Sequence, residues 1–311
     1  MKYRAVEAES QSSLKNILKH PLLYKSKVNK STKSLSMGSL VDCLLLTPKD
    51  FDKTYLINKM EDPPEAVKKI YDLVYKSWKA IEFIDIDGEI INVCKQLNYR
   101  QTQGDVVKLK YITKYDHYLK FLKEAENKII VSLKDYERAC ELTGILNKDT
   151  VINNEVFNLS KDEENIFQKE IYWVYDGVPL KSLLDLITIN HKKKTIQPWD
   201  LKTTGFAVDK FENSLYKFRY DFQASFYTEA LMNEYPDYRI LPFRFIVVST
   251  VMNDRPRIFE CSERVLSVGK IGDDKLKGWL EALETLKFHA KTNIWNDTKR
   301  NIEGGDIIKL I

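Results

Sequence analysis

The chain has 311 residues, 43% of them hydrophobic and 30% charged, and its formal net charge is +4. This composition indicates a folded globular enzyme or binding module and leaves little room for long disordered segments. The small excess of basic residues permits nucleic-acid binding through a local patch but does not by itself imply it. The first twenty residues have no apolar core and no run approaches membrane-spanning length, so we expect a cytoplasmic protein without a signal peptide.

Thiol and imidazole side chains are too scattered along the chain to predict a metal centre of their own. The four cysteines form no CxxC pair, and the four histidines show no HxxxH spacing. We therefore expect reduced thiols in core positions and structural or surface histidines. The residues concerned are Cys43, Cys94, Cys140 and Cys261, with His20, His117, His191 and His289.

Two helices are expected near the N-terminus. Residues 9–24 predict a capped amphipathic helix that ends at Pro21, and 25–36 predict a basic loop that either contacts phosphate or lies in water. Residues 37–48 predict an apolar helix that follows Gly38 and stops before Pro48. Asp42 interrupts this helix, and it is either a solvent-facing residue or a buried carboxylate that needs a partner or a metal.

Residues 49–130 read as scaffold. Pro63-Pro64 begins a predicted helix through Trp78, residues 81–93 resemble a hairpin, and 111–126 predict a second helix. A short strand at 129–131 precedes a helix that begins after Ser132 and runs to about Leu146. From residue 154 the pattern becomes that of strands, at 155–157, 168–175, 178–189 and 195–201.

A pair of carboxylates and a lysine is the main chemical signal of these strands. Asp200 and Lys202 alternate along a predicted strand, so their side chains share one face. If the turn between the strands is centred between Lys192 and Lys193, Asp185 falls directly opposite Asp200. Two adjacent carboxylates favour a divalent cation of the magnesium type, which prefers oxygen ligands; the alternative is a solvated hairpin face. Glu170 could reach the same patch or form a strand-edge salt bridge.

A long helix is predicted from Asp209 to Glu234. Arg219, Gln223 and Tyr227 recur every four residues and form a polar stripe along one of its faces. Strands at 243–250 and 257–261 follow, and 262–295 is largely helical. No internal repeat and no low-complexity tract is present.

In this order, the residues resemble the PD-(D/E)XK nuclease superfamily, in particular its RecE-type and lambda-type phage exonucleases with a QxxxY helix. The resemblance is carried by Asp185, by Asp200-Leu201-Lys202, and by Gln223 with Tyr227. The segments SQSSLKNILKHPLLY, MGSLVDCLLLTPKDF and YKFRYDFQASFYTEAL are similar to the helices of that group. The resemblance implies an α/β (α+β) fold with a central mixed β-sheet flanked by helices, forming one domain over 1–311 with an unmatched insertion at about 60–125.

The resemblance also implies the roles of the site residues. Asp185 and Asp200 would bind Mg²⁺ or Mn²⁺ with the carbonyl of Leu201, and Lys202 would orient or help deprotonate the attacking water. Gln223 and Tyr227, with Arg219 beside them, would position the substrate. RecE-type members commonly have histidine and lambda-type members glutamate where this chain has Asp42, so Asp42 is the least certain metal ligand.

The function implied is a Mg²⁺-dependent 5′→3′ exonuclease that digests double-stranded DNA ends to generate 3′ single strands for phage-type recombination. A single-strand annealing protein and a ring-shaped homo-oligomer are implied as partners, in the host cytoplasm if the protein is phage-encoded. The alternatives are a single-strand or structure-specific nuclease of the same superfamily and a catalytically silent DNA-binding protein. No GxxxxGK[ST] phosphate loop is present, so we do not expect unwinding activity.

Overall fold

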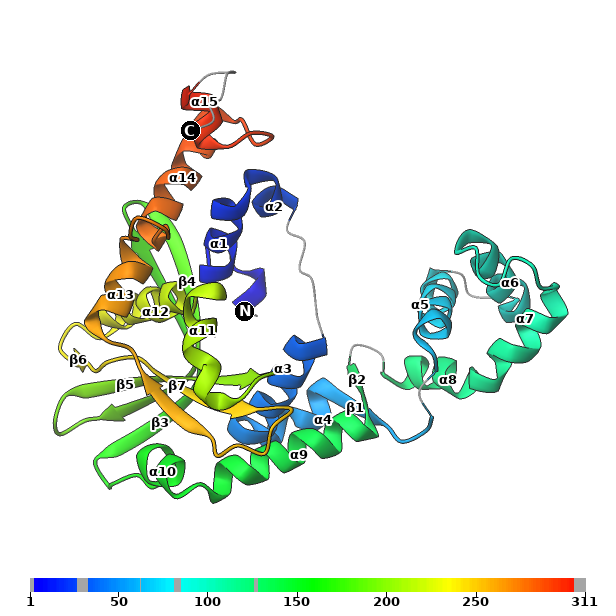
Figure 1. Ribbon diagram of the computed structural model, residues 1–311, viewed down its shortest axis with the longest axis horizontal. Helices are drawn as coiled ribbons and strands as arrows, with labels where there is room; N and C mark the ends of the chain where they lie inside the picture. The colour runs from blue at the N-terminus through cyan, green and yellow to red at the C-terminus, as the bar shows by residue number, and fades with distance from the viewer. Residues whose placement is uncertain (1–2, 27–32, 62, 81–84, 126–127, 305–311) are drawn as a thin grey trace. The chain divides into compact units, whose positions relative to one another are not determined.

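The structure is a computed structural model that describes residues 3–26, 33–61, 63–80, 85–125 and 128–304 (Figure 1). It divides into two compact units, one of residues 1–46 with 142–311 and the other of residues 47–141. The expected insertion at 60–125 lies within the second unit. None of the described helices combines the length and the apolar character needed to cross a bilayer.

A mixed six-stranded sheet forms the centre of the first unit, in the order β3-β4-β5-β7-β8 with β6 also paired to β5. Only the pairings of β5 with β6 and β7 are parallel, because helices connect these strands, whereas β3, β4 and β5 follow one another through tight turns. The strands are β3 (Glu163–Tyr175), β4 (Val178–Asn190), β5 (Thr195–Thr204), β6 (Arg239–Ile240), β7 (Arg244–Ser249) and β8 (Arg257–Glu260).

Helices pack against this sheet and against one another. The helices of the first unit are α1 (Gln11–Lys19), α2 (Pro21–Ser26), α3 (Lys33–Leu46), α10 (Thr150–Ile152), α11 (Phe211–Lys217), α12 (Tyr220–Glu234), α13 (Glu263–Lys270), α14 (Trp279–Thr292) and α15 (Lys299–Gly304). α12 packs on β3 and β4, α3 packs on β4 and β5, and α1 contacts both α12 and α14. α12 is buried on nearly all sides, with Phe222 and Phe226 in the core and polar side chains such as Gln223 also buried, so it presents no exposed polar face. The predicted mixed sheet flanked by helices is therefore confirmed.

The second unit is mainly helical. Its two short strands, β1 (Tyr55–Asn58) and β2 (Ile129–Ser132), pair in parallel. Its helices are α4 (Phe51–Thr54), α5 (Glu65–Ala80), α6 (Ile86–Gln96), α7 (Asp105–Ile112) and α8 (Asp116–Ala125), and α9 (Leu133–Lys148) leads back into the first unit. Buried residues of α5 to α8 such as Tyr71 and Ile90 form a core separate from that of the sheet.

Several predicted elements are wrong in type or extent. The expected strand at 155–157 is a π-helical turn, Asn153–Phe157, and the hairpin-like pattern at 81–93 is helix α6 over its described part, where Ile90 and Val93 face a helical core. The expected helix at 111–126 is broken between α7 and α8. α3 begins before Gly38 rather than after it. Of the four cysteines expected in core positions, Cys140 is exposed.

The expected helix from Asp209 to Glu234 is two helices, because Arg219 adopts a left-handed backbone conformation with φ 57° between α11 and α12. A non-glycine residue rarely adopts this conformation without compensation. Here the Arg219 guanidinium forms an ion pair with Asp221 at 3.1 Å and donates to the Lys277 carbonyl at 2.6 Å. These contacts fix the start of α12.

Close packing of α13 on α12 generates a stability prediction. A Cβ on Gly269 would lie 2.1 Å from the carbonyl oxygen of Asp221. We expect Gly269→Ala to lower the free energy of unfolding by about 1–3 kcal/mol, since the helices must move apart to admit a methyl group. Chemical denaturation measures this change.

The matched control is Gly144→Ala in α9, where an added Cβ meets no atom within 4 Å. This change should leave stability unaltered or raise it by roughly 0.5–1 kcal/mol, because alanine favours a helix over glycine. Equal stability of the two variants would contradict the packing argument.

Candidate active site

The two predicted carboxylates lie where β4 and β5 separate. Leu186 pairs with Trp199, so the register places Asp185 and Asp200 at the next position, as the predicted turn centre requires. Beyond it, β5 stays paired only along its other edge, with β7, while the edge of β4 that faced β5 takes a bridge from Glu9 to Leu180. The Leu201 backbone N–H donates to Asp185 Oδ2 at 3.2 Å across the opening fork.

The pairing of β4 with β3 is also interrupted, at the position of Asp185. The register skips the position where Gln168 faces Asp185, and Gln168 has a φ of 49°. Strained backbone of this kind concentrates at functional sites, where the surroundings compensate for its cost. Asp185 thus lies between two local breaks in an otherwise regular sheet.

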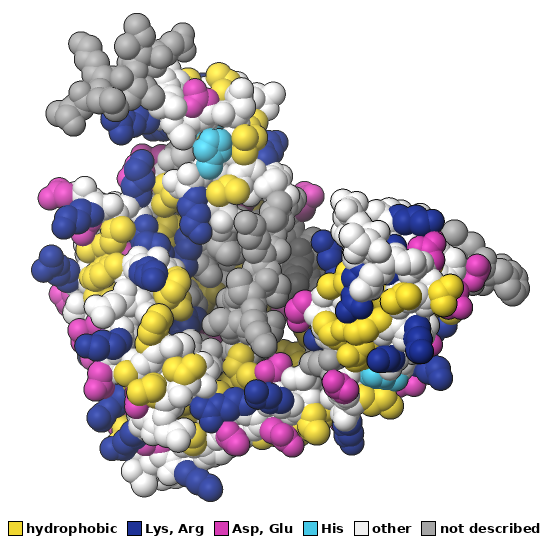
Figure 2. All heavy atoms as spheres, turned by 45° about the vertical axis from the view of Figure 1, so that its right-hand side comes forward, with side chains coloured by type: hydrophobic (Ala, Val, Ile, Leu, Met, Phe, Trp, Pro, Cys, Tyr) yellow, Lys and Arg dark blue, Asp and Glu magenta, His cyan; other side chains and the backbone are white. Residues whose placement is uncertain are grey.

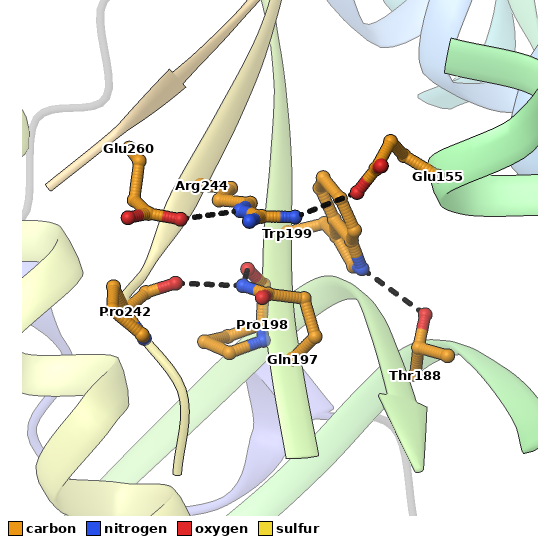
Figure 3. A network of polar contacts seen from close by, with 8 residues as sticks. All are labelled: Glu155, Thr188, Gln197, Pro198, Trp199, Pro242, Arg244 and Glu260. Atoms are coloured by element: carbon orange, nitrogen blue, oxygen red, sulfur yellow. Dashed lines mark hydrogen bonds and ion pairs between the residues drawn. The ribbon is translucent and has the colours of Figure 1, made fainter. Parts of the chain in front are cut away.

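A polar network holds β5 just before Asp200 (Figure 3). Trp199 Nε1 donates to Thr188 Oγ1 at 3.0 Å, which joins β5 to β4. Arg244 of β7 lies 5.3 Å from the Trp199 ring and bonds Glu260 at 2.7 Å and Glu155 at 3.0 Å. With these anchors the position of Asp200 is set by the sheet and not by a mobile loop.

Asp200 is 2% exposed, and a lysine and an amide side chain bind its carboxylate. Lys202 forms an ion pair with its Oδ2, and Gln223 Nε2 donates to its Oδ1 at 2.5 Å. Burial acts to lower the pKa of Lys202, but the carboxylates of Asp200 and Asp185 outweigh it and raise that pKa. The Lys202 ammonium therefore stays charged.

Asp42 of α3 joins this group. Its Oδ1 is buried without a hydrogen-bond partner among the described residues. Burial, followed by the charge of Asp185, raises the pKa of Asp42 well above its usual range, with a further contribution from Asp200. One carboxylate oxygen of Asp42 is therefore out of contact with water, while the residue as a whole is half-buried.

The three aspartates present more negative charge than their surroundings neutralise. Burial, and then Asp200, raises the pKa of Asp185 to about 7. In the described part of the chain, no three Asp, Glu, His or Cys side chains already converge on one ion position. The donor types nevertheless fit a hard divalent cation, because all are carboxylate oxygens, and two of them, Asp42 Oδ1 and Asp200 Oδ2, are buried without a hydrogen-bond partner among the described residues.

The predicted substrate stripe is only partly reproduced. Gln223 and Tyr227 lie on α12, and the Gln223 amide contacts Asp200. Tyr227 is buried in the core, where burial, and then the charges of Asp200 and Asp185, raise its pKa. Arg219 is not on the stripe, since it precedes the helix and its guanidinium is bound to Asp221 and Lys277.

Glu170 lies outside the aspartate cluster. It is exposed on β3 and accepts a hydrogen bond from the Tyr172 hydroxyl at 2.6 Å. Glu170 also borders a shallow hollow of about 520 Å³ whose lining includes none of the three aspartates. Its contact is a neighbour on its own strand rather than the expected salt bridge.

Sequence reasoning missed two residues beside the cluster. Tyr220 opens α12, and its ring centroid lies 5.1 Å from Lys202 Nζ. Lys15 of α1 is close enough for the charges of Lys202 and Asp200 to affect it. Both lie within motifs that the sequence singles out, but helical periodicity alone does not tell which face of α1 meets the site.

Comparisons with known proteins identify the family of the chain. No protein of curated function matches the sequence. A solved structure named "Putative exonuclease", from Eubacterium rectale, is similar over 98% of this chain and 90% of its own, with 11% identity and a TM-score of 0.47. The model of one family matches residues 10–292, which include all the predicted site residues. The chain therefore belongs to the family described as a PDDEXK-like domain of unknown function (DUF3799).

Proposed function

We propose that this protein is a metal-dependent deoxyribonuclease that digests DNA from its ends. The observation that carries the proposal is the meeting of Asp42, Asp185 and Asp200 with a charged Lys202 at the fork between β4 and β5. Family membership supports it, because the family is described as PDDEXK-like. Buried carboxylates that repel one another are costly in a structural core and useful where a cation and a phosphate bind.

Each residue has a role that its contacts suggest. Asp42, Asp185 and Asp200 would hold Mg²⁺, or Mn²⁺ in its place, with the Leu201 carbonyl as a further ligand. The cation supplies positive charge for the phosphate and lowers the pKa of a water molecule. Gln223 fixes the rotamer of Asp200 through their hydrogen bond. Lys202, held protonated by Asp200 and Asp185, suits orientation of the water and stabilisation of phosphate charge better than removal of a proton.

The finer parts of the proposal rest on the resemblance to RecE-type exonucleases. They are 5′→3′ polarity, a preference for double-stranded ends, a single-strand annealing protein as partner, a homo-oligomeric ring and a role in phage-type recombination in the host cytoplasm. On the face in Figure 2, basic and acidic side chains are intermixed, so no broad basic surface is visible there.

The first test is hydrolysis of end-labelled linear duplex DNA in Mg²⁺. We expect Asp200→Asn and Lys202→Met each to slow nucleotide release by at least about 10²-fold, as loss of transition-state charge stabilisation does elsewhere. Glu170→Gln, on the same sheet but outside the cluster, should retain full activity. The released products report polarity and strand preference.

Full activity of Asp200→Asn would show that the site is misassigned. Wild-type protein that binds DNA but never cleaves duplex, overhang or single-stranded substrates would favour a silent binding protein. Cleavage restricted to single strands or junctions would favour the structure-specific alternative.

Asp42 can be tested without an activity assay. Asn is nearly isosteric with Asp but uncharged, so Asp42→Asn should relieve repulsion by Asp185 and Asp200. In EDTA we expect the thermal midpoint to rise by about 2–4 °C, the shift that roughly 1 kcal/mol produces in a domain of this size. Stabilisation of the protein by added Mg²⁺ or Mn²⁺ should fall, because a ligand is lost.

Calorimetric titration with Mn²⁺ checks the same variant directly. A metal affinity equal to that of the wild type would remove Asp42 from the ligand set. A lower midpoint in EDTA would show that the carboxylate stabilises the fold instead of straining it.

A further inference from the structure

A half-buried lysine of α1 lies beside the aspartate cluster without a partner. The Lys15 ammonium lies 5.8 Å from the centroid of the Phe222 ring of α12, at the limit of a cation–π contact. In the described part of the chain it forms no ion pair and no hydrogen bond. A partly buried ammonium group normally has such a partner.

The charges around Lys15 do not supply that partner. Asp221 is bound to Arg219, and Asp200 is bound to Lys202 and Gln223. Burial, followed by repulsion from Lys202, lowers the pKa of Lys15 to about 7. The basic side chains of Lys15, Lys202 and Arg219 therefore surround the carboxylates of Asp200 and Asp221, and each carboxylate is already bound by Lys202 or Arg219.

α1 holds Lys15 in place. Leu14 and Ile17, on either side of it in the sequence, are buried in the core. A capping box fixes the start of the helix, since the Ser10 N–H donates to Ser13 Oγ at 2.8 Å and the Ser13 N–H donates to Ser10 Oγ at 3.3 Å. The ammonium is thus a preorganised group on a rigid element.

We propose that Lys15 binds a phosphate group of the nucleic-acid substrate next to Lys202. This inference rests on the proposed nuclease function and adds a second cationic residue to its site. A phosphate between Lys15 and Lys202 would supply the missing anionic partner and remove the repulsion between the two ammonium groups. Lys15 is a substrate-binding residue in this scheme and takes no part in proton transfer.

DNA binding without cleavage tests the proposal. A short fluorescent duplex would be titrated with full-length protein in Ca²⁺, which accepts the same oxygen ligands in looser geometry than Mg²⁺. Lys15→Gln should weaken binding about tenfold and reduce the dependence of log Kd on log salt by about one unit, as expected for one lost phosphate contact. Lys15→Arg should retain affinity within about threefold, because it keeps the charge.

Lys19→Gln is the matched control, because Lys19 lies one turn further along α1 and is exposed. Its affinity should stay within about twofold of the wild type. Thermal unfolding shows whether the variant is still stably folded. Lys15→Gln should have an unchanged or higher thermal midpoint, because it removes a cation that Lys202 repels.

Three outcomes would overturn the proposal: unchanged affinity and salt dependence of Lys15→Gln, an equal loss in Lys19→Gln, or a lowered thermal midpoint that Lys15→Arg fails to restore. If wild-type protein cleaves DNA while Lys15→Gln binds normally, only the role of Lys15 fails. If Lys15→Gln loses binding but the wild type cleaves no DNA, the phosphate contact stands and the nuclease function fails.

Discussion

The structure of the site depends on the separation of β4 from β5 at Asp185 and Asp200. Up to Leu186 and Trp199 the strands form a regular antiparallel pair. Beyond this pair, β5 no longer pairs with β4, and the Leu201 N–H donates to the Asp185 side chain. In a continuous antiparallel ladder the Leu201 N–H would pair with the backbone of β4. Because the strands separate, it donates to the Asp185 carboxylate instead, and the side chains of Asp185 and Asp200 face one another.

Charge at this fork is balanced only in part. Asp200 has Lys202 and Gln223, and Asp185 has the Leu201 N–H, whereas Asp42 Oδ1 is buried without a partner among the described residues. The fold tolerates this because Trp199, Thr188 and the Arg244 network anchor the strands immediately before the fork (Figure 3). The packing and hydrogen bonds of these neighbouring residues thus compensate for the stability lost at the carboxylates. Functional sites commonly combine a destabilising cluster with a stabilising surround in this way.

Helices α1 and α12 bring the remaining polar groups to the fork. α12 starts at a fixed point because Arg219, in a left-handed conformation, bonds Asp221 and the Lys277 carbonyl. From there its second turn carries Gln223 to Asp200. The contact of α1 with α12 then sets Lys15 beside Lys202, so residues nearly 190 positions apart share one electrostatic environment.

Local patterns in the sequence predict the strands around the site and the shared face of Asp200 and Lys202. With a turn centred between Lys192 and Lys193 they also predict the register that places Asp185 opposite Asp200. These follow from local rules, since strand periodicity and turn chemistry act over a few residues. Packing between distant segments places Asp42 near Asp185 and Lys15 near Lys202, ends the helix at Arg219, and keeps Glu170 apart from the site. Each of these depends on which helix face meets the sheet, and that choice is made by packing between segments far apart in the chain, which no local pattern encodes.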